Sequence, residues 1–189
     1  MKNNIISIYV ICVTLALVFS CGSTKPIEKV NGAVSVNVPF SEGKYKSDKN
    51  YFRAKQSGIS PDLPTAKKVA IMNAKAELSG LVNSTIKSVT DQYTNQRTVG
   101  SKLELEIKFE ELGREVVNES LVDVNIMDEK VFKETDNNFT YWVAIEMSKD
   151  AVLESLANKI SNDEKLQLDY DKMKFEQIFN SEMEKLKNE

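Results

Sequence analysis

The chain has 189 residues, of which 41% are hydrophobic and 28% charged, and its formal net charge is −3 at pH 7. These proportions are those of an ordinary globular protein and exclude a disordered or collagen-like chain. The weak negative charge, without a long Lys/Arg run, argues against nucleic acid as a partner. One domain is expected, because the residues after the first 20 can bury a single core without a metal or disulfide.

The N-terminal 20 residues have the pattern of a secretory signal peptide. Lys2 is followed by an uncharged stretch, Asn3–Ser20, which contains the apolar run Ile5–Phe19. A membrane-spanning helix needs about 20 apolar residues, and this run is shorter, begins after a basic residue and ends beside a small residue and a cysteine. A short uncleaved anchor helix is the alternative interpretation.

The end of this segment, Leu17-Val18-Phe19-Ser20-Cys21, resembles the lipobox of bacterial lipoproteins. In that family the signal is cleaved before the cysteine, which is then acylated on its sulfur and its new amine. The resemblance predicts lipidation at Cys21 and a signal peptide over residues 1–20. Two or more acyl chains hold a protein firmly on a membrane, at about 0.8 kcal/mol per buried methylene. Cleavage would remove Cys12, so no disulfide is expected within the mature chain.

The residues after the cysteine bear on localisation. No acidic residue follows directly, since the next residues are Gly22-Ser23-Thr24-Lys25. In bacteria with two membranes, the resemblance to lipoprotein sorting signals favours the outer membrane. The lack of an acidic cluster after Cys21 favours the periplasmic face of that membrane over the cell surface.

A flexible tether is expected over 21–32, a folded domain over 33–162 and a C-terminal helix over 163–189. Alternating valines predict a strand over 34–38, and Pro39 ends it. The Gly, Pro, Ser and Asp content of Phe40–Pro64 predicts a loop, with Tyr51 and Phe52 packed on the core. The densest basic stretch is expected to be a solvated face, with contact to anionic head groups as the alternative: Lys44, Lys46, Lys49, Arg53 and Lys55.

The strongest helix pattern covers Thr65–Asn83, where Thr65 supplies a capping hydroxyl and apolar residues recur at three-and-four spacing. Its small residues, which we call the alanine stripe, suit close packing on a sheet: Ala66, Ala70 and Ala74. The Ser, Thr, Val and Tyr content of Ser84–Val99 predicts a solvent-facing strand. An amphipathic helix is expected over Ser101–Asn118, bent near Gly113.

Two further strands are expected in the second half of the chain. Val122, Val124 and Ile126 share one face of the first. A hairpin joins Val131–Glu134 to Phe139–Met147, because Asp136-Asn137-Asn138 tolerates turn geometry. The side chains that share the buried face of this last strand are Tyr141, Val143, Ile145 and Met147. Trp142 points the other way and is expected to lie under a helix.

Two helices end the chain. The first spans Ser148–Lys159, with Ser148 as its cap, and its buried side is predicted to comprise Ala151, Val152, Leu156 and Ile160. The second follows Asn162 and is expected to dock on its own domain. Pairing with a partner helix and extension as a rod are the alternatives. The fold class is therefore α+β, an antiparallel sheet with helices packed on one face plus a C-terminal helix.

Three short segments resemble the Lpp20-type bacterial lipoproteins over roughly Tyr51–Met147. They are Tyr51-Phe52-Arg53-Ala54, the alanine stripe with Glu77-Leu78, and Tyr141-Trp142-Val143-Ala144. The resemblance implies a small α+β domain on an outer-membrane lipoprotein of unsettled biochemical role, with relatives in flagellar and envelope assembly. These are packing residues, and they imply no chemistry.

The sequence contains few of the residues from which catalytic and metal sites are built. The chain has no histidine, and its one mature cysteine is the lipidation site, which excludes histidine triads, thiol catalysis and zinc sites of His and Cys. Ser84 and Lys87 match a Ser-x-x-Lys spacing, but the accompanying motifs of penicillin-binding proteins are missing. A carboxylate site, the remaining chemistry, would draw on Glu104, Glu106, Glu110 and Glu111, or bind calcium within 128–138. The simpler interpretation is a solvated helix face.

We therefore expect that the protein is not an enzyme and that it has no catalytic residue, no cofactor and no metal. The sequence predicts a lipid-anchored outer-membrane lipoprotein that acts by binding or assembly in the cell envelope, with a membrane and an envelope protein as its partners. A surface-exposed adhesin or uptake accessory, and an enzyme that uses carboxylates alone, are the alternatives. The oligomeric state is left open.

Overall fold

The computed structural model describes residues 29–30, 33–34, 36–96, 102–163, 166 and 170–186. The chain divides into two compact units, Met1–Asn37 and Val38–Glu189. In the first, β1 (Lys29–Val30) pairs antiparallel with β2 (Ala33–Val34). The strand predicted over 34–38 is wrong, because Val36 and Val38 lie in no strand and are exposed. The predicted signal peptide and Cys21 lie outside the described residues.

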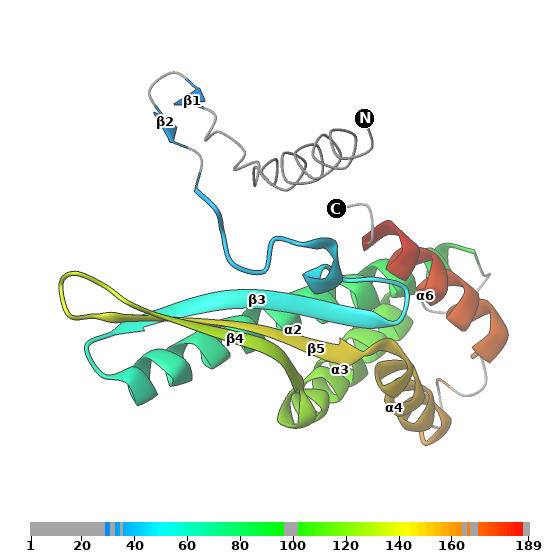
Figure 1. The fold of residues 1–189 in the computed structure, drawn as a ribbon. Coiled ribbons are helices and arrows are strands. Elements are labelled where there is room, and N and C mark those ends of the chain that lie inside the picture. Colours follow the sequence, from blue (N-terminus) through cyan, green and yellow to red (C-terminus); the bar gives the residue numbers. More distant parts are fainter. Residues whose placement is uncertain are drawn as a thin grey trace, which may run out of the picture. The chain divides into compact units, whose positions relative to one another are not determined.

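The second unit is built on a three-stranded antiparallel sheet (Figure 1), made of β3 (Tyr51–Ser60), β4 (Asn125–Lys133) and β5 (Phe139–Ser148) in the order β3-β5-β4. The predicted hairpin is confirmed: Asn137 adopts a left-handed φ of 66° and Asp136 accepts the backbone N–H of Asn138 at 3.0 Å. The loop predicted over 40–64 is wrong, since ten of its residues form β3. The fold is α+β, as predicted from the sequence.

One long helix, α2 (Leu63–Asn95), covers one face of the sheet, which we call the inner face. The alanine stripe is fully buried there, and Gly58 of β3 lies directly opposite it. A Cβ atom on Gly58 would lie 2.4 Å from the Ala66 carbonyl oxygen and 2.5 Å from the Ala70 nitrogen. Because Gly58 has no side chain and the alanines carry only methyl groups, the helix backbone can approach the strand closely, as the alanine spacing predicts.

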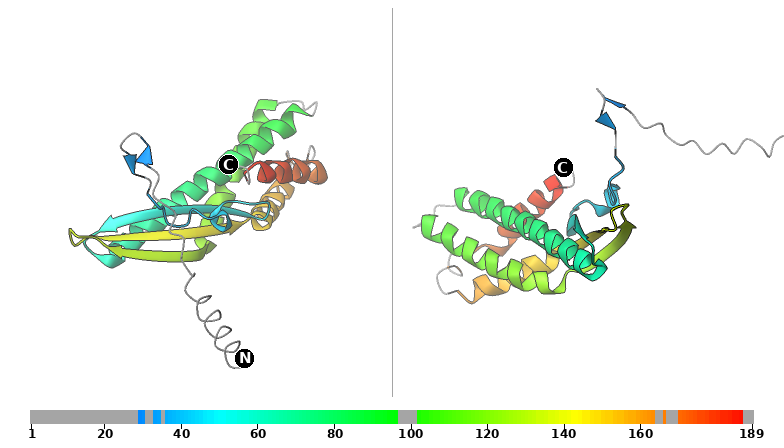
Figure 2. Two further views of the ribbon diagram at one scale, coloured as in Figure 1. Left: turned by 45° about the horizontal axis from the view of Figure 1, so that its top comes forward. Right: turned by 90° about the vertical axis from the view of Figure 1, so that its left-hand side faces the viewer.

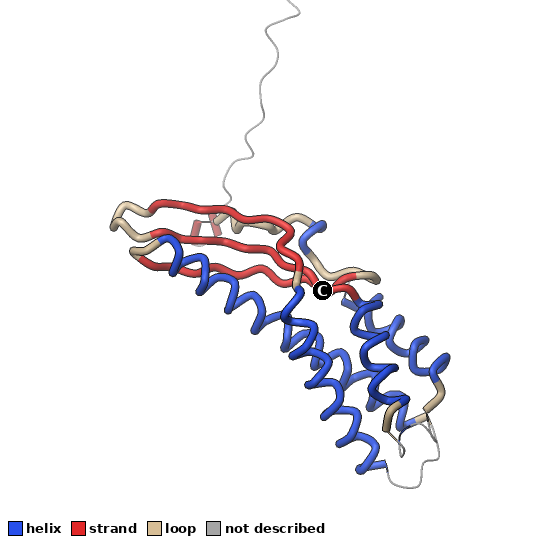
Figure 3. The backbone as a smooth tube through the Cα atoms, turned by 90° about the horizontal axis from the view of Figure 1, so that it is seen from below, coloured by secondary structure: helices blue, strands red, loops and turns tan. Residues whose placement is uncertain are grey.

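The helix α2 is longer than the sheet that it covers. Its 33 residues span about 50 Å at 1.5 Å per residue, whereas a ten-residue strand spans about 33 Å. Its C-terminal part therefore continues past the strands (Figures 2 and 3), where it packs with α3 (Lys102–Ser120) and α6 (Lys172–Leu186). The helix α4 (Lys149–Ser161) packs in turn on α3.

Large side chains fill this second part of the core. Tyr93 of α2 packs on Phe109 and Phe175, with ring centroids 6.0 Å and 5.5 Å away, and its hydroxyl accepts the Asp171 backbone N–H at 2.6 Å. Phe179 reaches Phe52 of β3 at 6.2 Å. The last helix therefore docks on its own domain, as expected.

Several predicted boundaries are corrected by the structure. Ser84–Asn95 is not a strand but the continuation of α2. The helix α3 runs without a break through Gly113, which is buried against Ile86. Asp62, not Thr65, caps α2, since its carboxylate accepts the Thr65 N–H at 3.0 Å.

Further along, residues 121–123 form the 3-10 turn η2 (Leu121–Asp123), so the strand predicted around Val122 begins only at Asn125. Ser148 caps α4 as predicted, but Ala151 is exposed, outside the buried side of that helix. Among the described residues, no helix combines the length and apolar character needed to cross a membrane.

Candidate binding surface

The outer face of the sheet, opposite α2, is crossed by the segment Val38–Asn50, which we call the strap. It contains a single 3-10 turn, η1 (Gly43–Tyr45). Phe40 is almost fully buried and has a φ of 61°, a left-handed conformation that is costly for a residue with a large side chain. The surrounding contacts must therefore hold the strap firmly enough to maintain this backbone.

Aromatic and apolar contacts attach the strap to the sheet. Phe40 and Tyr45 lie with ring centroids 4.8 Å apart and form a small core with Ala144, against which Met127 and Trp142 pack. Trp142 therefore points away from the Tyr141 face, as predicted, but the expectation that it lies under a helix of the main core is wrong. It is half-buried beside the strap, because residues of β5 with even numbers face outward.

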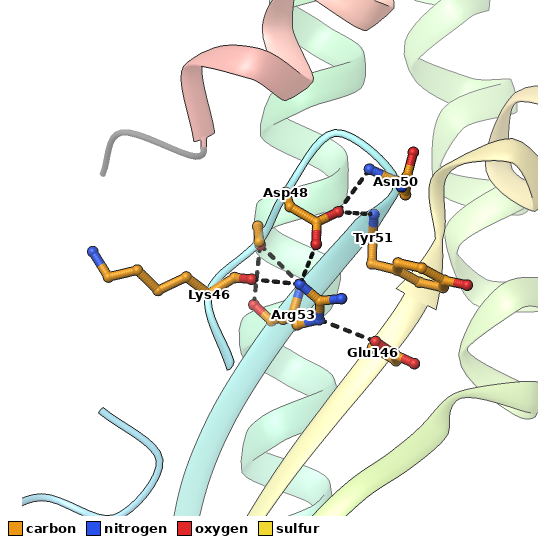
Figure 4. Close-up of polar contacts among 7 residues, drawn as sticks. Lys46, Asp48, Asn50, Tyr51, Arg53 and Glu146 are labelled. Atoms are coloured by element: carbon orange, nitrogen blue, oxygen red, sulfur yellow. Dashed lines mark hydrogen bonds and ion pairs between the residues drawn. The ribbon is translucent and has the colours of Figure 1, made fainter. Parts of the chain in front are cut away.

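Arg53 is the centre of a polar network that joins the strap to two strands (Figure 4). Its guanidinium donates to Asp48 Oδ2 at 2.5 Å, to the Lys46 carbonyl at 2.8 Å and to Glu146 Oε2 at 3.0 Å. Glu146 is its direct cross-strand neighbour on β5. The Arg53 side chain is only 11% exposed, so these contacts compensate a charge that has lost much of its water.

Asp48 closes the strap against the start of β3. Its Oδ1 accepts the backbone N–H groups of Asn50 at 2.8 Å and Tyr51 at 3.1 Å. Burial pushes the pKa of Asp48 upward, but these N–H groups and the Arg53 guanidinium outweigh it and hold the pKa below its ordinary value. Asp48 therefore stays ionised, which the network requires.

A second polar contact holds the middle of the strap. The Tyr45 hydroxyl donates to Asp128 Oδ2 of β4 at 2.5 Å, which lowers the pKa of Asp128 and raises that of Tyr45. Lys55 Nζ donates to the Phe40 carbonyl at 2.8 Å. The basic run predicted to be a solvated face is therefore partly used inside the domain: Arg53 and Lys55 bind the strap, while Lys44, Lys46 and Lys49 are exposed.

The strap leaves the hairpin end of the outer face uncovered. Ile59 and Phe132 are both direct neighbours of Thr140 on the central strand, so the three side chains lie in one row across the sheet. Ile59 is 62% exposed and Phe132 is 45% exposed, and Trp142 lies half-buried in the next row. We call Ile59, Phe132 and Trp142 the outer patch. Exposed apolar residues grouped in this way are typical of protein interaction sites.

The Ser-x-x-Lys pair lies in a groove of about 320 Å³ between α2 and α3. Ser84 Oγ donates to the Leu81 carbonyl at 2.9 Å, and Lys87 Nζ forms an ion pair with Glu110 at 2.5 Å. The hydrogen bond to Glu110 raises the pKa of Lys87 and lowers that of Glu110. A lysine held protonated cannot take a proton from the serine, so this arrangement does not activate Ser84.

Among the other predicted carboxylates, Glu106 contacts a hydroxyl and Glu111 contacts a cation. Glu106 accepts the Thr94 hydroxyl at 3.0 Å, Glu111 lies 3.7 Å from Lys108, and Glu104 is exposed. In 128–138, Asp128 binds Tyr45 and Asp136 binds Asn138. Within the described ranges, no three His, Cys, Asp or Glu side chains cluster as they would around a metal ion.

The comparisons with known proteins indicate no family. No protein-family model matches the chain, and neither does any curated protein. The resemblance to Lpp20-type lipoproteins therefore stays a prediction that rests on the three short segments. Sequence reasoning missed the strap network and the strand β3 that carries Arg53. One signal was present: three of the five even-numbered residues of β3 are small, namely Ala54, Gly58 and Ser60, whereas the odd-numbered residues are polar or bulky.

Proposed function

We propose that the protein is an outer-membrane lipoprotein, anchored through Cys21, that binds another envelope protein through the outer patch. The observation that carries the proposal is the row of exposed Ile59 and Phe132 across the sheet, beside a tryptophan. Large apolar side chains at the centre of a patch supply most of the free energy of binding in protein interfaces. The lipidated cysteine would keep this patch near the membrane and so raise the local concentration of membrane-bound partners.

The anchor is tested first, in the native bacterium. Cys21→Ser should move the chain from the membrane pellet to the soluble fraction or leave it as an unprocessed precursor. Protease added to intact cells should leave the wild-type chain uncut if the chain faces the periplasm. Cleavage under these conditions would instead support the surface-exposed adhesin or uptake accessory.

The binding surface is tested by crosslinking the intact chain in membranes and recovering it with its partners. A variant with Ile59→Asp and Phe132→Asp should lose a partner that the wild type recovers. The matched control is Met72→Asp with Leu103→Asp, which changes two apolar residues on helices that are 60% and 69% exposed. Equal loss in both variants, or no loss in either, would contradict a role for the outer patch.

Deletion of 163–189 is unsuited to this test. It would remove Phe175, Phe179 and Met183, which are fully buried in the core beside α2. A partner lost after such a deletion would report unfolding rather than a contact, so point substitutions on the exposed surface are required.

A further inference from the structure

The edge strand β4 differs from the other two strands in how little of it the helix α2 covers. The helix α2 packs on β3 and β5, because a helix about 10 Å wide covers about two strands spaced 4.8 Å apart. All nine residues of β4 are described, and each is exposed or half-exposed. On its inner face Val131 is 46% exposed, and its free edge carries backbone groups that pair with none of the strands the structure describes.

The backbone groups that point outward from β4 can be assigned from the hairpin. Glu134 donates its N–H to the Asn138 carbonyl at 2.8 Å, so the backbone of Glu134 points toward β5. Because the direction alternates along an antiparallel ladder, and the register is regular from Asp128 to Lys133, the groups that point to the free edge belong to Glu129, Val131 and Lys133. These are also the residues whose side chains lie on the inner face.

We infer that β4 pairs antiparallel with β4 of a second copy of this chain, with Val131 opposite Val131 about a two-fold axis. This register places Glu129 opposite Lys133 of the second copy, and Lys133 opposite Glu129, so opposite charges meet twice. It also uses the N–H and C=O groups of all three outward-pointing residues. On the outer face Lys130 lies opposite Phe132, where a cation can rest on an aromatic ring.

Other registers are disfavoured by the charges of the same strand. Centring the pair on Glu129 would place two carboxylates opposite each other, and centring it on Lys130 would do the same with two ammonium groups. Centring on Phe132 would leave only residues 131–133 of the strand in the ladder. The bulge between Ile126 and Asp128 ends regular pairing at the other side. The charges and the bulge thus admit the Val131-centred pair and oppose uncontrolled edge association.

The pairing would extend the binding surface. Two three-stranded sheets joined through β4 form one six-stranded sheet with both α2 helices on the same face, as the two-fold axis requires. The two outer patches then lie on one continuous outer face, with the two Phe132 side chains near its centre. This inference deepens the proposed function, and it rests on that function only because both concern assembly. The pairing itself needs neither Cys21 nor Ile59.

The register is tested by cysteine scanning of the full chain in membranes under mild oxidation. Opposite residues in such a ladder have Cα atoms about 5.5 Å apart, within disulfide range. Val131→Cys should therefore form a disulfide-linked dimer well above the level of the parent chain, which controls for Cys12 and Cys21. Glu129→Cys should not, because the two copies of residue 129 would be about 14 Å apart along the strands. Coexpressed Lys130→Cys and Phe132→Cys chains give a second reporter if Val131→Cys misfolds.

Charge exchange then tests the cross-strand pair in the Val131→Cys chain. Glu129→Lys or Lys133→Glu alone should lower the dimer yield at least about fivefold, and the double exchange should restore it to within about twofold. Protease resistance confirms folding, since Glu129 also binds Lys67 at 2.8 Å within the chain. No dimer from either reporter, equal crosslinking at Glu129→Cys, or a folded double exchange that stays monomeric would overturn the pairing. Partner capture that survives these results would leave the outer patch proposal intact.

Discussion

The two faces of the β3-β5-β4 sheet are covered by different kinds of contact. On the inner face α2 fits against β3 by shape, since Gly58 and the alanines allow backbone to approach backbone. On the outer face the strap is held by charge, through Arg53, Asp48 and the Tyr45 contact to Asp128. Packing of apolar surface changes little with pH or moderate salt. Ion pairs, by contrast, weaken when salt screens the charges or when acid protonates the carboxylate. The two covers of one sheet should therefore respond differently to solution conditions.

The largest expected effect is on the inner face. Gly58→Ala places a methyl group on the backbone of α2, which must move away, and we expect the free energy of unfolding to fall by about 3 kcal/mol or more. Urea unfolding of the chain measures it, and the loss should be the same at low and high salt. Gly80→Ala is the control, because no atom outside its own stretch of helix backbone lies within 4 Å of its Cβ position, and it should stabilise α2 by about 0.5–1 kcal/mol. A Gly58→Ala chain as stable as the wild type would contradict the close approach.

The next effect concerns the outer face. Arg53→Met keeps an unbranched apolar stem but leaves Asp48 and Glu146 without their guanidinium, at an expected loss of about 1.5–3 kcal/mol. Unlike the inner-face variant, this one should remove much of the salt dependence of unfolding. Lys68→Met, on an exposed part of α2, should change neither quantity. An Arg53→Met chain with unchanged stability and salt dependence would show that the network does not hold the strap.

Acid should release the strap before it disrupts the inner face. The pKa values of Asp48 and Asp128 are lowered in the folded chain, so their stabilisation is complete above the unfolded pKa of about 4 and is lost as pH falls through the lower folded values. Trp142, the only tryptophan, packs on the strap and reports this by its fluorescence. The emission should shift below about pH 4, while helical circular dichroism persists. A shift at the same pH in both signals would contradict separate covers.

The smallest effect is expected from Tyr45→Phe, which keeps the ring packed on Phe40 and removes only the hydrogen bond to Asp128. The pKa of Asp128 should rise toward its ordinary value, and trypsin should cut faster after Lys44 and Lys46 with little change in global unfolding. Tyr51→Phe, on the first residue of β3, is the matched control. Equal cleavage rates in the wild type and the Tyr45→Phe chain would show that this hydrogen bond adds nothing to the strap.

The inner face could be predicted from sequence in its main features, because its pattern is local. The alanines recur at helical spacing and the β5 residues alternate, so the helix, the hairpin and the buried face of β5 were all indicated. The extent of α2 was not. Thr85, Thr90 and Thr94 favour a strand by type, but in the helix the hydroxyls of Thr85 and Thr90 donate to carbonyls four residues earlier. Burial of Ile86, Val89 and Tyr93 in the core then stabilises the helix over a strand.

The outer face could not be predicted, because its contacts join residues far apart in the sequence. Tyr45 meets Asp128 across 83 positions and Arg53 meets Glu146 across 93, and no local pattern carries such pairs. Gly58 and Ser57 are common in loops, which concealed β3. The reason for the glycine is the nearby helix, which becomes evident only when both elements are in place.

The strap also has a mechanical consequence. It joins β3 directly to the part of the chain that leads to Cys21, so in an anchored molecule any tension between membrane and domain passes through it first. Its attachments follow one another along the chain, at Phe40, then Tyr45, then Asp48, and would break singly rather than together. Under load, extension of Val38–Asn50 would thus lengthen the connection between membrane and domain while the sheet and helices stay folded.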